Sequence, residues 1–566
     1  MFLDPGGITA VEDPDGLEAV DSQAPPGPGG EEARRVVVDD DGCAIRDTCG
    51  GHRCGDLVRS GEEQGVRAIR GVDEARAPVE MDGTRDVAGG MDRSGAAIGP
   101  PADVEDTDLR TADLVAEPLG RGKELRPGEA VHRAWSLRTA VGGRGRHRRY
   151  HTAVVGPFMP DAEKLAAVRD ALLALAAGIY LNTGLAGPLP TETAAAMDEL
   201  AGWQVRTGRA HLDAYPALLD RLAEARASIA AVLATDIQSI ALTRATTEGM
   251  NIAASSIDWR PGDRIVTTSQ EHPGCLGPLV AVRDRFGLEL DIADIGDGGD
   301  DDLTLAALAA AMRPETRLVA VSHVLWTTGA RLPVVRIAAL AHERGAVVAI
   351  DGAQSAGAIP VNVDKIGADF YALSGQKWLL GPEGTGALWV APAALERARP
   401  SHAGWFSFAR IGLDGEVAWQ PDARRFETSG FHPPSVAGFA RSCGWLSMYV
   451  GLPWIYDRGR LLARAAADRL ASIPGVALLT PRDRMATIVT FRIAGWPAEL
   501  ALDELGARVF AMARLIEPLD AIRISVGFFN TEAEVERLAG AVELLAAHTP
   551  DNLPPRSRLP ILGQVE

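Results

Sequence analysis

The chain has 566 residues, of which 46% are hydrophobic, and its formal net charge is -19. That length allows several domains with a large core, whereas the negative charge argues against a nucleic-acid partner, because duplex binding needs a concentrated basic surface. No run of about 18 apolar residues appears, so no transmembrane helix and no membrane partner are expected. Five cysteines in so long a chain do not indicate a disulfide framework. Because the N-terminus also lacks the basic and apolar regions of a signal peptide, we expect a cytoplasmic protein.

Residues 1 to about 155 differ from the rest in composition. Their only aromatic residues are Phe2, Trp135 and Tyr150, while Gly, Asp and Arg are abundant. Such a stretch buries too little apolar surface to offset chain entropy, which predicts disorder. A second interpretation is that the start codon is assigned too far upstream, because Met159 immediately precedes the first amphipathic segment.

Three cysteines and a histidine lie close together in this N-terminal part, at Cys43, Cys49, His52 and Cys54. Their C-x5-C-x4-C spacing matches no tight zinc-ligand knuckle. Incidental cysteines in a flexible segment are therefore the preferred interpretation, and no metal site is expected.

From Met159 onward the hydrophobic pattern becomes regular. Apolar residues at helical spacing predict helices over 161–179 and 213–233. Strands and helices then alternate, with strands at 237–242, 264–268, 288–292, 318–323 and 347–350, and helices at 247–255, 278–286, 303–312 and 333–344. This alternation indicates a mainly parallel, doubly wound α/β sheet. The tail from about 446 to 547, with strands at 486–492 and 521–526, fits a smaller α+β domain.

Ligands of open α/β sheets bind at the carboxyl ends of the strands, and two of these ends carry polar groups. Asp351 follows the strand at 347–350, where its carboxylate could pair with a protonated pyridine nitrogen or simply cap the next turn. Thr243 to Gly249 lead from a strand into a helix. Hydroxyls and free N–H groups at a helix N-terminus suit a phosphate, and an ordinary capping box with Thr246 or Thr247 as N-cap is the alternative.

A lysine follows a third strand-like run, 370–373. Lys377 lies 26 positions after Asp351, between that run and the Gly-rich turn 381–386. The whole chain has only four lysines, Lys123, Lys164, Lys365 and Lys377. A surface lysine is the alternative, but apolar residues flank Lys377 on both sides, and a buried amine has a lowered pKa that makes it nucleophilic and basic near neutrality.

Together these segments resemble the class V aminotransferase family of fold-type I enzymes, which use pyridoxal phosphate (PLP) and include cysteine desulfurases, C–S lyases and isopenicillin N epimerase-like proteins. The resemblance runs from about Tyr180 to Val535. It implies an N-terminal arm at 159–190, a PLP-binding large domain at 191–435 and a small α+β domain at 436–552. Residues 1–158 then form a low-complexity, disordered segment, and 553–566 form a tail.

The resemblance also implies roles for individual residues. Lys377 would hold PLP as a Schiff base, Asp351 would pair with the pyridine nitrogen, and His272 would stack on the ring. Other cofactor contacts would come from Gln354 at the ring hydroxyl and from Thr246, Thr247, Ser374 and Gln376 at the phosphate. In many relatives the residue matching Gln376 is His.

Two further segments complete the implied site. Residues 424–429, with Thr428 and Ser429, resemble the stretch that reaches the phosphate of a neighbouring subunit, which implies a homodimer. Arg523 matches the arginine that clamps the substrate carboxylate, and Asn182 is the second expected substrate contact. A guanidinium suits bidentate binding of a carboxylate.

The type of reaction depends on residues outside this shared set. Desulfurases need a mobile cysteine shortly before the carboxylate arginine, but 505–522 contain none, and the only cysteines after residue 158 are Cys275 and Cys443. The segments 322–329, 180–184 and 187–190 look closest to the cyst(e)ine C–S lyase branch. We therefore expect β-elimination on a cysteine- or cystine-like amino acid. Transamination or epimerisation on the same apparatus is the alternative, and an inactive PLP-fold binding protein is a further one.

Overall fold

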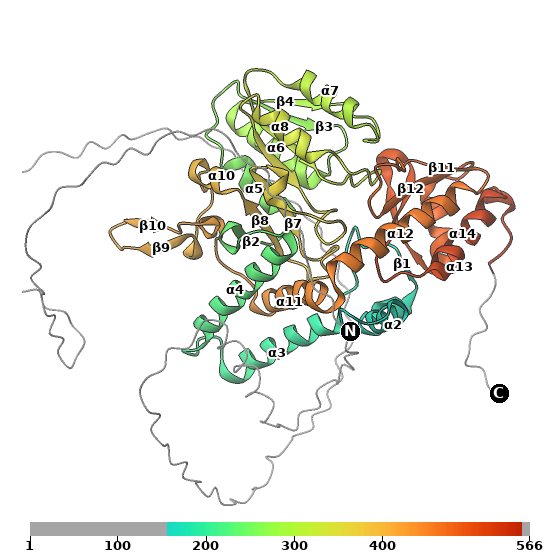
Figure 1. Cartoon of the computed structure of the whole chain (residues 1–566), viewed down its shortest axis with the longest axis horizontal. Helices are drawn as coiled ribbons and strands as arrows, with labels where there is room; N and C mark the ends of the chain where they lie inside the picture. Colours follow the sequence, from blue (N-terminus) through green and yellow to red (C-terminus); the bar gives the residue numbers. More distant parts are fainter. Residues whose placement is uncertain (1–155, 557–566) are drawn as a thin grey trace, which may run out of the picture. The chain divides into compact units, whose positions relative to one another are not determined.

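The computed structural model describes residues 156–556 (Figure 1). The expectations for residues 1–155, including disorder and the Cys43–Cys54 cluster, lie outside the described residues. Within the described part, no group of three or more His, Cys, Asp or Glu side chains is arranged to hold a metal ion. None of the helices in residues 156–556 combines the length and the apolar composition that a bilayer crossing requires.

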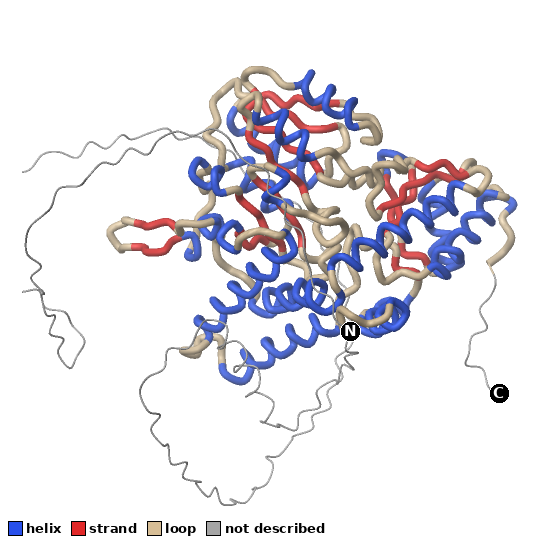
Figure 2. Tube along the Cα trace, viewed as in Figure 1, coloured by secondary structure: helices blue, strands red, loops and turns tan. Residues whose placement is uncertain are grey.

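A seven-stranded sheet forms the centre of the fold (Figure 2). In spatial order its strands are β2 (Ile240–Thr243), β8 (Gly386–Val390), β7 (Phe370–Ser374), β6 (Val347–Asp351), β5 (Thr316–Ser322), β3 (Arg264–Thr268) and β4 (Glu289–Ala293). All neighbouring pairs are parallel except the two that β8 makes with β2 and β7. The expected mainly parallel sheet is therefore confirmed.

Helices cover both faces of this sheet because its buried strands are apolar on both sides. In β6, Ile350 packs into one core cluster and Ala349 into the opposite one. One cluster also takes in helices α4 (Ala214–Leu233), α7 (Asp301–Ala311), α8 (Val334–His342) and α11 (Pro433–Gly444). The other takes in α5 (Thr246–Ser255), α6 (Pro273–Phe286) and α10 (Pro392–Arg397). The sheet is doubly wound, as expected.

A second, smaller core lies in the C-terminal part. Its antiparallel sheet runs β11 (Val476–Leu478), β12 (Ile488–Ile493), β15 (Ala521–Ser525) and β14 (Arg514–Ile516). Helices α12 (Leu452–Ala471), α13 (Ala498–Val509) and α14 (Glu532–Ala546) contribute to the same cluster. Strand β1 (Ile179–Tyr180), from the start of the described chain, pairs in parallel with β13 (Ala511–Met512).

The remaining elements belong to neither of these two sheets. They are α2 (Asp161–Ala171), α3 (Thr191–Thr207), α9 (Val363–Ile366), the hairpin of β9 (Phe408–Ile411) and β10 (Val417–Trp419), and a π-helical turn over Trp445–Val450 between α11 and α12.

The helix predicted over 161–179 is shorter in the structure. It ends at Ala171 because Leu172 leaves the helical region, with φ -114° and ψ 72°. A 3-10 turn, Leu173–Ala177, follows. Ile179 does not continue a helical face but pairs with Ala511, more than 300 positions later, so tertiary pairing overrides the local periodicity.

Candidate active site

The polar residues singled out above meet at the carboxyl ends of the parallel strands. Asp351 is the last residue of β6 and Ser374 the last of β7, and these two strands pair in parallel. Thr246 begins α5 directly after β2. The sheet therefore brings together residues as far apart in sequence as Thr246 and Ser374, 128 positions.

Lys377 lies in the turn after β7, with its side chain partly buried. Burial lowers the pKa of its amine to about 8, with the positive charges of Arg523 and Arg514 acting in the same direction and Asp351 opposing them. Near neutral pH an appreciable fraction of this amine is therefore unprotonated, as a nucleophile or base must be.

Asp351 is almost fully buried, at 4% exposure. One carboxylate oxygen, Oδ1, accepts a hydrogen bond from the Ala353 N–H at 2.9 Å. Burial raises the pKa of Asp351, while the positive charge of Lys377 lowers it. A cationic ring nitrogen placed here would act in the same direction as Lys377 and favour the ionised carboxylate.

His272 is the N-cap of α6, where its Nδ1 accepts a hydrogen bond from the Gly274 N–H at 2.9 Å. The Trp326 ring meets it edge-on, with centroids 5.1 Å apart. Burial, followed by the charges of Lys377, Arg514 and Arg523, lowers the pKa of His272 to about 4. The imidazole is therefore neutral at physiological pH, and since Nδ1 accepts, its proton resides on Nε2.

Gln354 bridges two other segments of the site. Its Nε2 donates to the Gly184 carbonyl at 2.8 Å, and its Oε1 accepts from the Trp378 indole N–H at 2.8 Å. These two bonds hold the amide in one orientation. They tie it to Trp378, the residue after Lys377, and to Gly184 in the N-terminal segment. Its position as a ring-hydroxyl contact stays a prediction.

The expected phosphate contacts gather at the N-terminus of α5. The Ser374 hydroxyl accepts a hydrogen bond from the Thr246 N–H at 2.8 Å and lies 2.7 Å from the Thr246 hydroxyl. Thr247, the next residue, is exposed, and the Gln376 side-chain oxygen is buried without a hydrogen-bond partner. A helix N-terminus lined by hydroxyls favours an anion.

A glycine allows this close approach of α5 to the sheet. A Cβ on Gly249 would lie 2.7 Å from the Cβ of Ala372 in β7, a separation that real Cβ atoms essentially never show. Any larger residue would therefore push the N-terminal turn of α5 away from β7, and Thr246 away from Ser374.

Arg523 is 1% exposed, in the middle of β15. Its NH1 donates to the Trp326 carbonyl at 2.8 Å, while its Nε and NH2 are buried without partners. Burial, followed by the charge of Arg514, lowers the pKa of this guanidinium to about 9. An arginine with unused buried donors is set up to receive a carboxylate.

Asn182 lies close to the strand that carries Arg523. It forms a parallel β-bridge with Ser525, two residues after the arginine. The Asn182 side-chain oxygen and the Ser525 hydroxyl are both buried without partners. The unused polar atoms of this part of the structure thus converge on one place, which suits a polar ligand rather than an apolar core.

Arg514 is a site residue that the sequence analysis missed. It lies directly opposite Arg523 in the antiparallel pair β14–β15, so both side chains project from the same face of the small sheet. Its charge influences Lys377, His272 and Arg523. No ion pair or side-chain hydrogen bond of Arg514 occurs among residues 156–556. A sequence prediction of the short strand 514–516 would have been the signal. A strand only nine positions before Arg523 can form an antiparallel pair with the strand of Arg523 and so place Arg514 opposite it.

The segment expected to reach a neighbouring subunit lies beside α5 of its own chain. The Ser429 carbonyl accepts a hydrogen bond from Arg244, two positions before Thr246. Thr428 contacts Gly404 through its backbone, and its carbonyl accepts from the Phe406 N–H at 3.0 Å. Contact of Thr428 and Ser429 with a phosphate in a second subunit stays a prediction.

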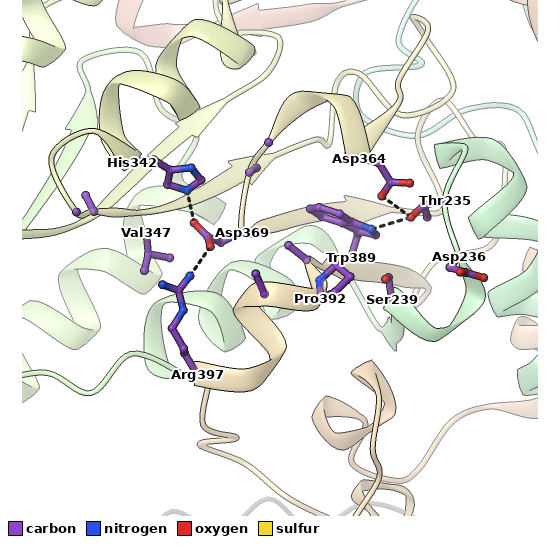
Figure 3. Close-up of a pocket in the computed structure, with 16 residues that line it drawn as sticks. Thr235, Asp236, Ser239, His342, Val347, Asp364, Asp369, Trp389, Pro392 and Arg397 are labelled. Atoms are coloured by element: carbon purple, nitrogen blue, oxygen red, sulfur yellow. Dashed lines mark hydrogen bonds and ion pairs between the residues drawn. The ribbon is translucent and has the colours of Figure 1, made fainter. Parts of the chain in front are cut away.

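A cavity of about 700 Å³ lies at the opposite edge of the sheet (Figure 3). Its lining includes Val347, where β6 begins, and Asp369, just before β7. Three of its charged or titratable groups already interact with one another: Asp369 binds His342 at 2.8 Å and Arg397 at 3.2 Å. The unpartnered donors at Arg523 therefore identify the functional site better than the size of this cavity does.

Comparisons with known proteins agree with this geometry. The aminotransferase class-V family model matches residues 179–538. Isopenicillin N epimerase of Streptomyces clavuligerus is 34% identical over 389 residues, covering 65% of this chain and 94% of that protein. A probable cysteine desulfurase of Mycolicibacterium paratuberculosis is also 34% identical, over 343 residues that cover 58% of this chain and 49% of that protein.

Solved structures give the same result. The cystine C–S lyase C-DES in complex with its reaction product, cysteine persulfide, has a TM-score of 0.63 and 28% identity over 66% of this chain and 99% of its own. The cysteine desulfurase of Thermococcus onnurineus NA1 has a TM-score of 0.61 and 27% identity over 68% and 98%. The fold-type I architecture and the enzyme class expected from the sequence are confirmed: this chain belongs to the class V aminotransferase family.

Proposed function

We propose that this protein is a PLP-dependent C–S lyase that removes a sulfur leaving group from Cβ of a cystine-like amino acid. Its family makes it a PLP enzyme. The reaction itself is our inference, and it rests chiefly on two arginines, Arg514 and Arg523, that face the same site.

The residues present fit this cofactor. Asp351 offers a buried carboxylate, His272 a neutral ring, and the N-terminus of α5 an anion site. The unpartnered Gln376 oxygen is a further buried polar atom beside Lys377. PLP supplies a covalent attachment point for amino groups and an electron sink for charge that develops at Cα.

The protein's own residues supply binding and proton transfer. Arg523 and Asn182 would hold the α-carboxylate through donors and acceptors that are otherwise unused. This contact fixes the substrate relative to Lys377. The Lys377 amine, with its pKa of about 8, would accept the Cα proton and could return it to a leaving group. Asp351 would hold the ring nitrogen in its charged form, and His272 would restrict the ring to one plane.

The second arginine points to the substrate. Arg514 is half-buried, faces the same side of the sheet as Arg523 and has no carboxylate partner among residues 156–556, so it can bind a second anion beyond the one at Arg523. Cystine carries two carboxylates, one on each half, whereas cysteine and alanine carry one. A disulfide-linked amino acid of this kind places its sulfur leaving group between the two arginines.

The available cysteines do not favour desulfuration. Between residues 505 and 522 there is none. Cys275 and Cys443 are fully buried, in α6 and α11, and burial raises the pKa of both thiols. A thiol that is neutral and buried is a poor nucleophile for sulfur transfer.

Epimerisation is the second candidate, because isopenicillin N epimerase matches over 94% of its own length. That reaction returns a proton to Cα instead of expelling a group from Cβ. The two candidates differ in products: elimination releases ammonia and a keto acid, whereas epimerisation changes only the optical activity of the substrate.

The test is to supply the PLP-loaded protein with L-cystine and with S-methyl-L-cysteine, which lacks the second carboxylate, and to measure pyruvate, ammonia and persulfide. We expect pyruvate from L-cystine. The Arg514→Gln variant should raise KM for cystine about 10- to 100-fold, the loss of a charge-assisted hydrogen bond, and leave S-methyl-L-cysteine nearly unaffected. Keto-acid-dependent amine transfer without pyruvate, or racemisation alone, would refute the lyase assignment.

We further propose a cytoplasmic homodimer. Large apolar side chains are exposed on and beside α3 and α4, with Val205 at 87% and Leu212 at 90% exposure. Exposed apolar side chains on adjacent elements of the chain are consistent with an interface there. Light scattering of the purified protein should give twice the chain mass, and a monomer that retains full activity would contradict this assembly.

A further inference from the structure

A buried glutamate that no step above uses lies behind the site. The Glu271 carboxylate, 8% exposed, accepts hydrogen bonds from the Thr268 hydroxyl at 2.6 Å, the Ser322 hydroxyl at 2.6 Å and the Ser322 N–H at 3.0 Å. Thr268 ends β3 and Ser322 ends β5. Glu271 thus fastens two neighbouring strand ends at the catalytic edge of the sheet.

Glu271 is linked to both groups that would contact the cofactor ring: to Asp351 through Ser322, and to His272 as its neighbour in the chain. Ser322 is the register partner of Asp351 in the parallel pair β5–β6. The next residue, His323, donates its N–H to the Asp351 carbonyl at 2.9 Å. His272 follows Glu271 in the chain and caps α6. A shift of the Glu271 carboxylate would therefore move the ends of both segments.

Within residues 156–556, no positively charged group is among the side chains that face the Glu271 carboxylate, so its negative charge would be stabilised by hydrogen bonds alone. From β3 and β5 they are the Thr268 and Ser322 hydroxyls, from α6 the neutral Cys275 thiol, and from β6 the Asp351 carboxylate. Burial raises the pKa of Glu271 to about 7; the hydrogen bonds from Ser322 and Thr268 lower it, and Asp351 raises it. Two buried carboxyls this close do not ionise independently.

We propose that Glu271 is a positioning residue that carries a proton in the acidic form of the enzyme, so that in this form Asp351 alone holds the negative charge at the cofactor ring. Protonated Glu271 keeps β3 and β5 fastened without competing with Asp351 for ionisation. When Glu271 loses its proton, a second negative charge appears behind Asp351. This charge would raise the pKa of the cofactor group that is bound to Lys377. This inference rests on PLP bound as described under the proposed function but not on the type of reaction.

The test uses the visible absorbance of the holoenzyme, which reports the protonation of the cofactor bound to Lys377. Absorbance and circular dichroism are recorded between pH 5.5 and 9.5, without substrate. The wild-type protein should titrate in two steps, one of them near the Glu271 pKa of about 7. In Glu271→Gln the lower step should disappear, and the remaining midpoint should fall by about one pH unit because a nearby negative charge is lost.

A milder variant gives a directional check. Ser322→Ala removes one hydroxyl donor to Glu271 and keeps the carboxyl. Because that hydrogen bond lowers the pKa of Glu271, its loss should move the lower step to higher pH. This variant keeps the inference testable if Glu271→Gln fails to fold.

The matched control is Glu534→Gln. Glu534 has the same 8% exposure but lies in α14, where it pairs with Arg169 at 2.8 Å. Its variant should keep both steps. Two unchanged steps in Glu271→Gln, or an unmoved lower step in Ser322→Ala, would overturn the role of Glu271. A wild-type protein without any cofactor absorbance would instead overturn the proposed cofactor use.

Discussion

The segment leading to Thr428 and Ser429 is anchored by a buried ion pair, which gives a measurable stability prediction. Arg226 of α4 donates through Nε and NH2 to the two carboxylate oxygens of Glu427, at 2.8 Å and 2.6 Å. The side chains are 10% and 0% exposed. The Leu242 N–H of β2 donates to the same carboxylate at 2.9 Å. Glu427 therefore joins a helix, a strand and the segment 424–429.

Glu427→Ala would leave the Arg226 guanidinium buried without its partner. Removing one member of a buried pair costs about 3–5 kcal/mol, because the remaining charge stays desolvated. The lost bond to Leu242 adds to this, so we expect a loss near the upper end of that range. Urea denaturation of the holoenzyme, followed by far-UV circular dichroism, would measure it.

The double variant Arg226→Met with Glu427→Leu is the control, since replacing both charges by apolar groups of similar size is often nearly neutral. We expect it to recover most of the stability that Glu427→Ala loses. A loss below about 1 kcal/mol in Glu427→Ala, or a double variant as unstable as the single one, would refute the reasoning from buried charge.

Two further predictions concern the catalytic edge of the sheet. Lys377→Ala should abolish the covalent cofactor adduct that borohydride traps in the wild type, as mass spectrometry of peptides would detect. In the wild type, kcat should rise with pH through about 8, because only the unprotonated Lys377 amine accepts a proton. Gly249→Ala should destabilise the protein by about 1–3 kcal/mol, because the new Cβ would lie 2.7 Å from that of Ala372. The same variant should bind PLP more weakly in a fluorescence titration, and unchanged binding would contradict the packing argument.

Local patterns predicted most elements of the sheet because buried parallel strands are short, apolar and flanked by amphipathic helices. The strand predicted at 264–268 matches β3, and the one at 347–350 extends by one residue, to Asp351. Helix α6, in contrast, begins at Pro273, five residues before the predicted start. Its first turn is fixed by proline at N1 and by the His272 cap, which an apolar count does not register.

The sequence by itself singled out Lys377 among four lysines and Asp351 after its strand as candidate site residues, because residue type and order are local, and the family resemblance added His272. Tertiary structure decided which other groups join them. Arg514 enters the site only because β14 pairs with β15, and Asn182 only because its segment bridges to Ser525. Glu271 acquires its partners from β3 and β5. Such contacts depend on strand register and burial, which no local stretch of sequence encodes.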